Sequence, residues 1–451
     1  MKVKILLIIL FINLQNIHSQ CLFKDVTTLN ATSFGIGTNN KLYGWGLTTY
    51  FNLNTTSNMQ TNVTQVGLDE DWEKIDGGNN HVLLLKSNGA LWAMGWNFDG
   101  ELGDNTTTDR YNPVQIGTAN NWIAISAGER FSLGLKNDGT LWAWGNNQYG
   151  QLGNGTTVNQ RVPVQVGNES NWSKIAAAKN NRAFAIKSNG TLWAWGRNET
   201  GNLGLGNYSV TYIPTQVGTD NDWHTVSSGF VHTQALKNNN TLWAWGSTGL
   251  GNNTTAGSLI PIQIGVDSDW QYIDANYGNS KAVKLDGTLW CWGPNANGQV
   301  GDGTLIDKLI PTKIGQDTNW SGIFSGQLQT LAVKTDFQIY SWGTNNFGQL
   351  ANGNTTNLSS PYQINCSTLS INDFDDNYNS VKIVPNPTND TFQISSEDIF
   401  HKVELYDITS RMIKSWSIEQ DQYSLADINN GVYTVVIYSS KSIIVKKIIK
   451  K

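Results

Sequence analysis

A short segment of the form Trp-x-Trp-Gly, or a close variant of it, recurs seven times along the 451-residue chain. Its closing glycines are Gly46, Gly95, Gly145, Gly196, Gly246, Gly293 and Gly343. A second aromatic residue precedes each glycine by 23 or 24 positions, namely Phe23, Trp72, Trp122, Trp172, Trp223, Trp270 and Trp320. A fixed period of this length indicates a repeat architecture in which each copy is one supersecondary unit.

Each copy is expected to contain several short strands. In the third copy two apolar runs flank Asp138-Gly139, which predicts a tight hairpin of type I′. The seventh copy has Asp336-Phe337 in the same place. A phenylalanine is strained in the left-handed conformation that such a turn needs, so we expect a different turn there.

The number and uniformity of the copies favour a closed ring. A unit of about fifty residues with three or four strands cannot bury both of its faces alone. Seven units can do so by stacking radially, which leaves only short protected edges. The terminal copies are not atypical, as the caps of an open solenoid would be. We therefore predict an all-β chain with a seven-bladed β-propeller over residues 20–366.

The repeat resembles that of the regulator of chromosome condensation family. The similarity lies in Asp/Asn-Gly-Thr-Leu-Trp-Ala-Trp-Gly, as at residues 138–145, and in Asn-x-x-Gly-Gln-Leu-Gly, as at residues 147–153. It covers roughly residues 21–366 and implies a seven-bladed propeller. It says little about function, because this fold serves exchange factors, enzyme inhibitors and many exported proteins.

Both ends of the chain indicate export. Lys2 and Lys4 precede an apolar run, Ile5–Ile12, which is too short to span a membrane and predicts a signal peptide over residues 1–19. Lipid attachment at Cys21 is a weaker alternative, because the residues before it lack the usual small apolar types. We expect a soluble or surface-attached mature protein without a membrane span.

The C-terminal region differs in composition from the repeats. Residues 367–380 are polar and acidic and predict a linker, and residues 381–451 contain several strand-like segments that suit a small β-sandwich. This segment resembles the C-terminal sorting domain of the type IX secretion system. The resemblance implies contact with the secretion machinery and passage across the outer membrane. The matching residues include Pro385, Asn386, Pro387, Gly431, Tyr433, Lys446 and Lys447.

Two cysteines stand where the ring would close. Cys21 precedes the first copy and Cys366 follows the seventh, and the two ends of a closed ring are neighbours. Export permits disulfides, so we predict a Cys21–Cys366 bond. Cys291 replaces a small apolar residue of the repeat and is expected to be buried.

No catalytic or metal-binding group emerges from the repeat. His81 and His232 occupy a position that holds Phe131 in the third copy, which indicates packing rather than catalysis. Acidic pairs precede the unit tryptophan in some copies, as in Asp267-Ser268-Asp269. Calcium could use such oxygens, but Asx turns explain the position better, since other copies have Asn there. We predict no cofactor, no metal and no enzymatic activity.

Seventeen of the nineteen tryptophans fall on repeated positions and are expected to pack between blades. Trp416 lies in the C-terminal region. Trp96 is the one remaining tryptophan of the repeats, so it is the candidate for a surface contact.

The composition excludes some partners and leaves others open. A net charge of −5 without a basic cluster in the repeats gives no reason to bind nucleic acid. Loops that differ between otherwise similar copies suggest a monomeric exported scaffold that binds a protein or glycan. A secreted enzyme acting on polysaccharides is the alternative. Nucleotide exchange, by analogy with the founding family, conflicts with the export signals.

Overall fold

The computed structural model describes residues 22–53, 55, 57–365, 381–395, 400–406, 412–416, 420, 422–439 and 443–451. Two compact units are present, one spanning Ser19–Cys366 and the other containing Ser367–Lys451. Cys21 and Cys366, and with them the predicted disulfide, lie outside the described residues, as do the predicted signal peptide and linker.

The first unit consists of seven antiparallel sheets, each of four strands that follow one another in the sequence. We number these sheets as blades 1 to 7. The first strands are β1 (Phe23–Thr28), β5 (Trp72–Gly77), β9 (Trp122–Ala127), β13 (Trp172–Ala177), β17 (Trp223–Ser228), β21 (Trp270–Asn276) and β25 (Trp320–Ser325). The second strands are β2 (Thr32–Gly37), β6 (His81–Lys86), β10 (Phe131–Lys136), β14 (Arg182–Lys187), β18 (His232–Lys237), β22 (Asn279–Lys284) and β26 (Gln329–Lys334). The predicted seven-bladed propeller is confirmed.

The remaining strands of the blades complete each sheet. The third strands are β3 (Leu42–Leu47), β7 (Leu91–Gly95), β11 (Leu141–Gly145), β15 (Leu192–Gly196), β19 (Leu242–Gly246), β23 (Leu289–Gly293) and β27 (Ile339–Gly343). The fourth strands are β4 (Met59–Gln65), β8 (Arg110–Gln115), β12 (Gln160–Gln165), β16 (Thr211–Gln216), β20 (Ser258–Gln263), β24 (Lys308–Ile314) and β28 (Leu358–Gln363).

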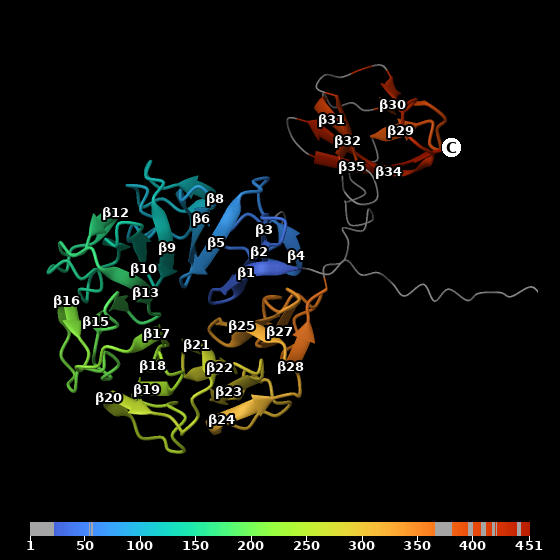
Figure 1. The fold of residues 1–451 in the computed structure, drawn as a ribbon. Coiled ribbons are helices and arrows are strands. Elements are labelled where there is room, and N and C mark those ends of the chain that lie inside the picture. The colour runs from blue at the N-terminus through green and yellow to red at the C-terminus, as the bar shows by residue number, and fades with distance from the viewer. Residues whose placement is uncertain are drawn as a thin grey trace, which may run out of the picture. The chain divides into compact units, whose positions relative to one another are not determined.

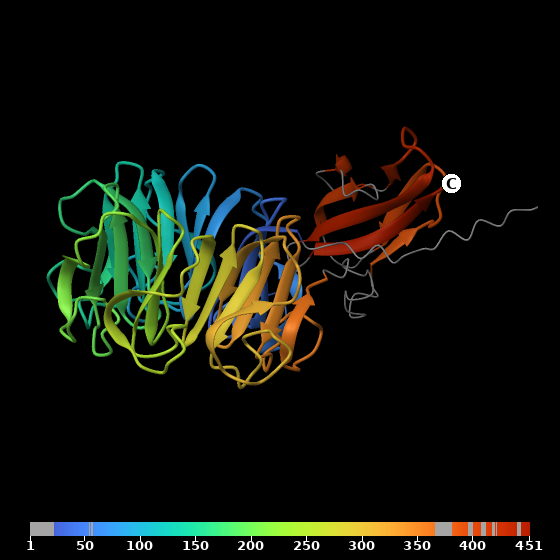
Figure 2. The same ribbon diagram turned by 60° about the horizontal axis from the view of Figure 1, so that its bottom comes forward.

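The first strands surround the centre of the ring, and the fourth strands form its periphery (Figure 1). Figure 2 shows the blades standing side by side around the ring. All fourth strands except that of blade 1 contain a proline, as at Pro163. Since proline cannot donate a backbone hydrogen bond, these outer edges resist pairing with another strand.

The tryptophan of Trp-x-Trp-Gly that adjoins the glycine is buried against the preceding blade. The Nε1 atom of Trp195 in blade 4 donates to the Gln151 carbonyl of blade 3 at 2.9 Å. Gly153 lies beneath the same indole, because a Cβ atom there would be 2.7 Å from Trp195 Nε1. Indole and glycine therefore fit one another across the interface between the blades.

The seventh blade meets the first through the same hydrogen bonds, although Ala351 stands where blade 3 has Gly153. Trp45 Nε1 donates to the Gln349 carbonyl at 2.9 Å, as Trp195 does to Gln151. A backbone bond from the loop of one blade to the fourth strand of the next also occurs at every interface. These bonds run from Asn52 N to Tyr111 O, Asn105 N to Arg161 O, Gly155 N to Tyr212 O, Gly206 N to Leu259 O, Asn253 N to Leu309 O, Gly303 N to Ser359 O and Gly353 N to Thr61 O. The ring is therefore closed.

The hairpin between the second and third strands differs from the prediction. Gly139 has a φ of 77° and donates from its backbone nitrogen to the Lys136 carbonyl at 3.0 Å, whereas Asp138 has no positive φ. This is a type I turn followed by one left-handed residue, not a type I′ turn. Phe337 adopts the same conformation, with a φ of 66°, so the expectation of a different turn in the seventh copy is also wrong.

A buried asparagine organises five of the loops between third and fourth strands. The Asn147 amide donates to Asn154 Oδ1 at 3.2 Å and to the carbonyls of Thr156 and Val158 at 3.0 and 3.2 Å, while its Oδ1 accepts from Leu152 N at 3.0 Å. The equivalent residues in the other four loops are Asn97, Asn198, Asn295 and Asn345. The loops of blades 1 and 5 have no such asparagine.

The second unit contains two small sheets. One contains β29 (Lys382–Val384), β30 (Thr391–Ser395) and β33 (Tyr423–Ser424), and the other contains β32 (Met412–Trp416), β31 (Phe400–Tyr406), β34 (Gly431–Ser439) and β35 (Ile443–Lys450). Phe392, Leu405 and Val435 are among the residues of its single apolar core. The predicted small β-sandwich is confirmed.

We predict that Gly153→Ala destabilises the propeller more than Gly167→Ala. Both glycines have a positive φ, of 67° and 63°, but a Cβ atom at Gly167 would meet nothing within 4 Å. Both variants therefore share a left-handed backbone cost, and only Gly153→Ala also collides with Trp195. Denaturant unfolding should show an additional loss of roughly 1–3 kcal/mol for Gly153→Ala. Equal losses would contradict the indole–glycine contact.

We predict that the stabilisation by Glu101→Gln develops as the pH rises from 4.5 to about 7 and is complete above that range. Glu101 is buried where blade 3 has Gln151, and burial raises its pKa from 4.5 to about 7. The fold therefore disfavours the carboxylate, and the free energy of unfolding falls as pH rises through this range. The effect is on the order of 3 kcal/mol. At pH 8 the free energy of unfolding of Glu101→Gln should exceed that of the wild-type protein by this amount, and at pH 4 the two should be nearly equal. The same difference at both pH values would contradict the raised pKa of Glu101.

Candidate functional site

The turns between first and second strands and the loops between third and fourth strands emerge on one face of the propeller, which we call the loop face. In blade 2 they are joined by a bond from Trp96 N to the Asn80 carbonyl, and in blade 3 by one from Asn146 N to the Arg130 carbonyl, both at 2.8 Å. Because the first strands surround the centre, these first turns encircle the mouth of a central channel (Figure 1).

One residue of each first turn contributes to a set that we call the mouth ring. Its members differ in chemistry from blade to blade, although the strands that carry them are similar. They are Asn30, Asn79, Glu129, Lys179, Phe230, Tyr277 and Gln327. The loop face therefore carries side chains that differ between copies around a constant scaffold.

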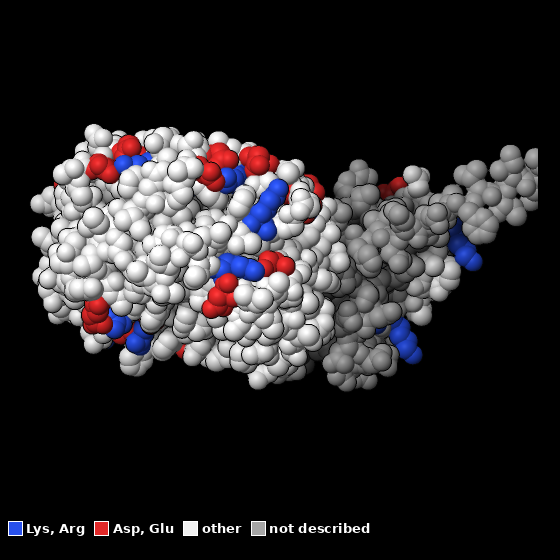
Figure 3. Space-filling model, turned by 90° about the horizontal axis from the view of Figure 1, so that it is seen from below, with Lys and Arg blue, Asp and Glu red and all other residues white. Residues whose placement is uncertain are grey.

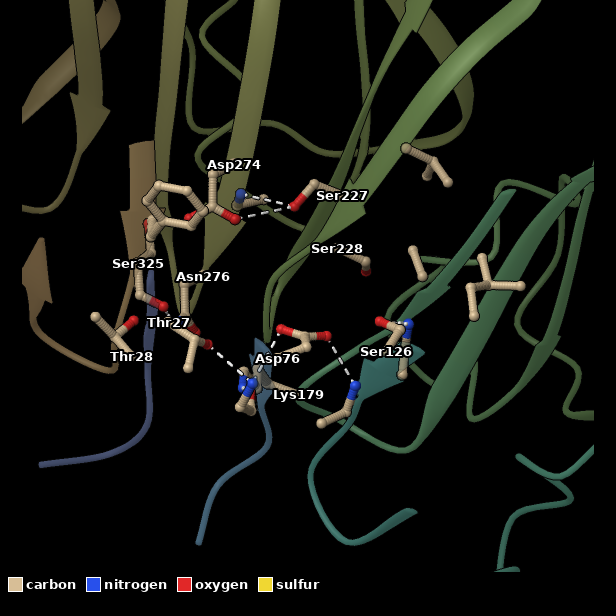
Figure 4. Close-up of a pocket in the computed structure, with 18 of the residues that line it drawn as sticks. Thr27, Thr28, Asp76, Ser126, Lys179, Ser227, Ser228, Asp274, Asn276 and Ser325 are labelled. Carbon is tan, nitrogen blue, oxygen red and sulfur yellow. Dashed lines mark hydrogen bonds between the residues drawn. The ribbon is translucent and has the colours of Figure 1, made fainter. Parts of the chain in front are cut away.

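The channel below the mouth ring is a polar cavity of about 310 Å³ lined by the first strands (Figure 4). The Lys179 ammonium donates to the carbonyls of Gly77 and Gly78 in blade 2. Asp76 Oδ2 accepts from Ala127 N of blade 3 at 2.9 Å. Burial raises the pKa of Asp76 and lowers that of Lys179. The hydrogen bonds of Asp76 and Lys179 thus join blades 2, 3 and 4.

Hydroxyl groups of the channel join other neighbouring blades. Ser126 Oγ accepts from Ala177 N at 3.0 Å, and Ser227 Oγ accepts from Ala275 N at 2.9 Å. Thr27 Oγ1 accepts a bond of the same kind from Gly77 N at 2.8 Å. These polar groups of the channel therefore have a structural partner in the next blade.

Trp96, the tryptophan outside the repeat pattern, lies on the loop face within an aromatic cluster. Its ring stacks on Tyr50 of blade 1 at 5.7 Å between centroids with an interplanar angle of 11°. The Arg130 guanidinium of blade 3 lies 4.9 Å from the Trp96 ring and 5.6 Å from that of Phe98. Arg130 also pairs with Asp99 at 2.9 Å. We call Tyr50, Trp96, Phe98 and Arg130 the Trp96 cluster.

The Trp96 cluster is specific to one place in the ring. Phe98 is 65% exposed, so this cluster presents an apolar surface to solvent. The residues equivalent to Trp96 in the other blades are Leu47, Asn146, Arg197, Ser247, Pro294 and Thr344. The four members come from three blades, which explains why sequence reasoning identified Trp96 but not Tyr50 or Arg130.

A second aromatic group on the loop face was missed by the sequence analysis. Phe230 and Tyr277 stack at 5.2 Å between centroids with an angle of 20°. The Tyr277 carbonyl accepts from Phe230 N at 3.1 Å and from Val231 N at 3.0 Å. The Gln327 amide donates to Tyr277 Oη at 2.6 Å. Blades 5, 6 and 7 thus fix the ring of Tyr277.

The repeated histidines are structural, as their position predicted. His81 Nε2 lies 3.0 Å from Ser132 Oγ of blade 3, and His232 Nε2 lies 2.7 Å from Ser280 Oγ of blade 6. Both are buried, and burial lowers the pKa of each to about 3, so both are neutral at physiological pH.

The acidic pairs before the unit tryptophans bind lysine side chains. Lys284 Nζ lies 2.7 Å from Asp267 and 3.1 Å from Asp269, and it also lies over the rings of Trp270 and Trp290. Figure 3 likewise shows charged residues in small clusters of both signs. In the described part of the chain, no group of three His, Cys, Asp or Glu residues could hold a metal ion. From blade 2 onward, each second strand ends in a lysine, and this repeated lysine was the overlooked sequence signal for the ion pairs.

The residues that suggested a sorting domain meet in the second unit. Asn386 Oδ1 accepts from Ile449 N at 3.0 Å, and the Thr388 carbonyl accepts from Lys451 N at 2.9 Å. Tyr433 Oη donates to the Asn429 carbonyl at 2.7 Å. The Pro385–Pro387 segment thus adjoins the C-terminal strand, which also contains Lys446 and Lys447; the side chain of Lys447 is outside the described set.

Comparisons with known families match both units. The family profile of the RCC1-like domain matches residues 120–395, and profiles of the regulator of chromosome condensation (RCC1) repeat match residues 72–101 and 88–135. A secretion system C-terminal sorting domain matches residues 382–451 and marks the chain for export. No curated protein matches the chain. Within the described residues, no helix has the length and apolar character of a membrane span.

Solved structures share the propeller. Human WBSCR16 has 18% identity and a TM-score of 0.62, with 74% of this chain and 94% of that chain covered. Yeast RCC1 (Prp20), solved bound to Kap60, has 18% identity and a TM-score of 0.66, with 81% and 90% covered. Prp20p from Saccharomyces cerevisiae, from a study of its binding to Gsp1p and histones, has 19% identity and a TM-score of 0.66, with 80% and 90% covered. At these identities the structures support the fold alone. Because the RCC1-like domain profile covers more than half of the residues, the chain belongs to the RCC1-like domain family and carries a secretion-system sorting domain at its C-terminus.

Proposed function

We propose that the mature protein is an exported binding module that holds a macromolecular partner on its loop face. The Trp96 cluster carries this proposal, because it places the exposed ring of Phe98 beside half-buried aromatic and arginine side chains at one defined place in the ring. Tryptophan, tyrosine and arginine are the residues that dominate the energy of binding surfaces. The stacking of Tyr50 on Trp96 and the ion pair of Arg130 with Asp99 preorganise this surface.

A binding role agrees with how the polar groups of the propeller are used. The two buried histidines, the channel hydroxyls of Thr27, Ser126 and Ser227, and the acidic pair at Asp267 and Asp269 have partners in the structure. Chemistry would need a nucleophile or base free to reach a substrate. Variable side chains on a closed scaffold are instead suited to recognition.

We propose that the second unit delivers the propeller by engaging the type IX secretion machinery, with residues 1–19 directing the first export step. The match to a sorting domain and the contact between Asn386 and the C-terminal strand support this route. The proposed product is a monomer at the cell surface or beyond it, with Cys21 and Cys366 joined.

The proposed function predicts that binding depends on the Trp96 cluster. Full-length mature protein should bind the surface of the cells that secrete it, and Trp96→Ala combined with Phe98→Ala should weaken this binding at least about tenfold. Tyr111→Ala is the matched control, because Tyr111 is an exposed aromatic residue on the outer strand β8. Quantitative binding of labelled protein to washed cells measures the effect. Equal binding of all three proteins would refute a binding role for this cluster.

A further inference from the structure

The loop face has its two aromatic groups on opposite sides of the channel mouth. The Trp96 cluster belongs to blades 1 to 3, whereas Phe230 and Tyr277 belong to blades 5 and 6. In a closed ring of seven blades these positions face one another across the channel (Figure 1). The mouth-ring residues Asn79, Asn30 and Gln327 belong to blades 2, 1 and 7, which lie between the two groups on one side of the ring, and all three are half-buried.

Tyr277 has a strained backbone conformation. Blade 6 is the one blade whose first turn has two residues, Tyr277 and Gly278, between paired Asn276 and Asn279. Tyr277 has a φ of 45°, which is strained for a residue with a bulky side chain, and the residue is nevertheless 36% exposed. Strain of this kind persists where the surroundings enforce it and is concentrated at functional sites.

The neighbouring loop of blade 5 is short. It spans residues 247–257, whereas the equivalent loop of blade 3 spans residues 146–159, and it lacks the buried asparagine of the longer loops. The aromatic pair therefore lies beside a short loop on this face. Gln327, whose amide donates to the Tyr277 hydroxyl, is half-buried beside it.

Four charged residues of the loop face have partners within the protein. Arg130 pairs with Asp99 at 2.9 Å and Arg197 with Glu199 at 2.6 Å. Lys179 donates to backbone carbonyls, and Glu129 accepts from the Asn181 amide at 2.9 Å. An ionic ligand would have to displace these pairs. Aromatic planes and amides are thus the groups left for recognition.

We propose that the partner on the loop face is a neutral polysaccharide whose chain crosses the channel mouth from the Trp96 cluster to Tyr277. This inference rests on the proposed function and names its ligand class. The apolar faces of sugar rings match the exposed aromatic rings at both ends, and sugar hydroxyls match the amides between them, which both donate and accept. Two sites on one rigid ring favour a polymer over a short oligosaccharide through effective concentration.

The test uses full-length mature protein and three neutral polysaccharides as probes, laminarin, xylan and mannan, with anionic alginate as the contrast. Affinity electrophoresis should show retardation by at least one neutral polymer, with Tyr277→Asn weakening it about tenfold. Asparagine is chosen because it tolerates a positive φ, so it removes the ring without adding backbone strain. Unchanged thermal unfolding of Tyr277→Asn and unchanged binding of Tyr111→Ala are the controls.

Several results would overturn the inference. Retardation by alginate alone would exclude a neutral ligand, and equal affinity for the polymer and its trisaccharide would exclude a chain that spans both sites. If no neutral polymer binds but Trp96→Ala with Phe98→Ala still abolishes cell-surface binding, the ligand is not a neutral polysaccharide and the proposed function stands. If neither assay depends on these residues, both proposals fail.

Discussion

The fold depends on the packing of an indole on the preceding blade, which meets a glycine at five of the seven interfaces and Ala351 at the seam between blades 7 and 1. A blade leaves both of its faces apolar, so its stability comes from the neighbours that cover them. Trp195 packs on Gly153 and donates to the Gln151 carbonyl, which couples shape to hydrogen bonding in one contact. Because this packing recurs around the ring, successive blades have a similar relative orientation. This regular orientation allows the last blade to meet the first.

The two aromatic groups of the loop face occur where this regular pattern is interrupted. Blade 2 has Met94 in place of the indole, and the blade 1 loop fills the interface with Phe51 instead of a glycine loop. Tyr50, next to Phe51 in that loop, is thereby placed on Trp96. Blade 5 differs from the repeat in its shortened loop, and blade 6 differs in its two-residue first turn, where Tyr277 is exposed. Departures from the repeat, rather than the repeat itself, create the proposed recognition surface.

Sequence reasoning reached the architecture because it depends on periodic features. The spacing of Trp-x-Trp-Gly was enough to predict seven blades, and the position shared by His81, Phe131 and His232 indicated packing there. The turn type was not accessible in the same way. Asp138-Gly139 suits two hairpin geometries, and only the measured φ values distinguish them. Calcium and Asx turns were considered for the acidic pairs while the ion pairs to Lys284 were missed, because their partner lies on another strand.

The candidate site was only partly accessible from the sequence for a related reason. Trp96 was recognisable because it breaks the pattern, whereas Phe230 and Tyr277 occupy turn positions that vary in every copy. Their stacking depends on the conformation of one turn in blade 6, which no periodicity encodes. The same holds for Arg130, whose contact with Trp96 exists only after blades 2 and 3 are assembled.

Amide hydrogen exchange at the seam between blades 7 and 1 tests the closed ring most directly. The backbone amide of Gly353 donates to Thr61 across this seam, as that of Gly155 donates to Tyr212 between blades 3 and 4. If the seam closes through the same contacts, the two amides should exchange with protection factors that agree within about tenfold. Exchange of the Gly353 amide at the rate of an unstructured chain, with Gly155 protected, would show an open ring and contradict the account.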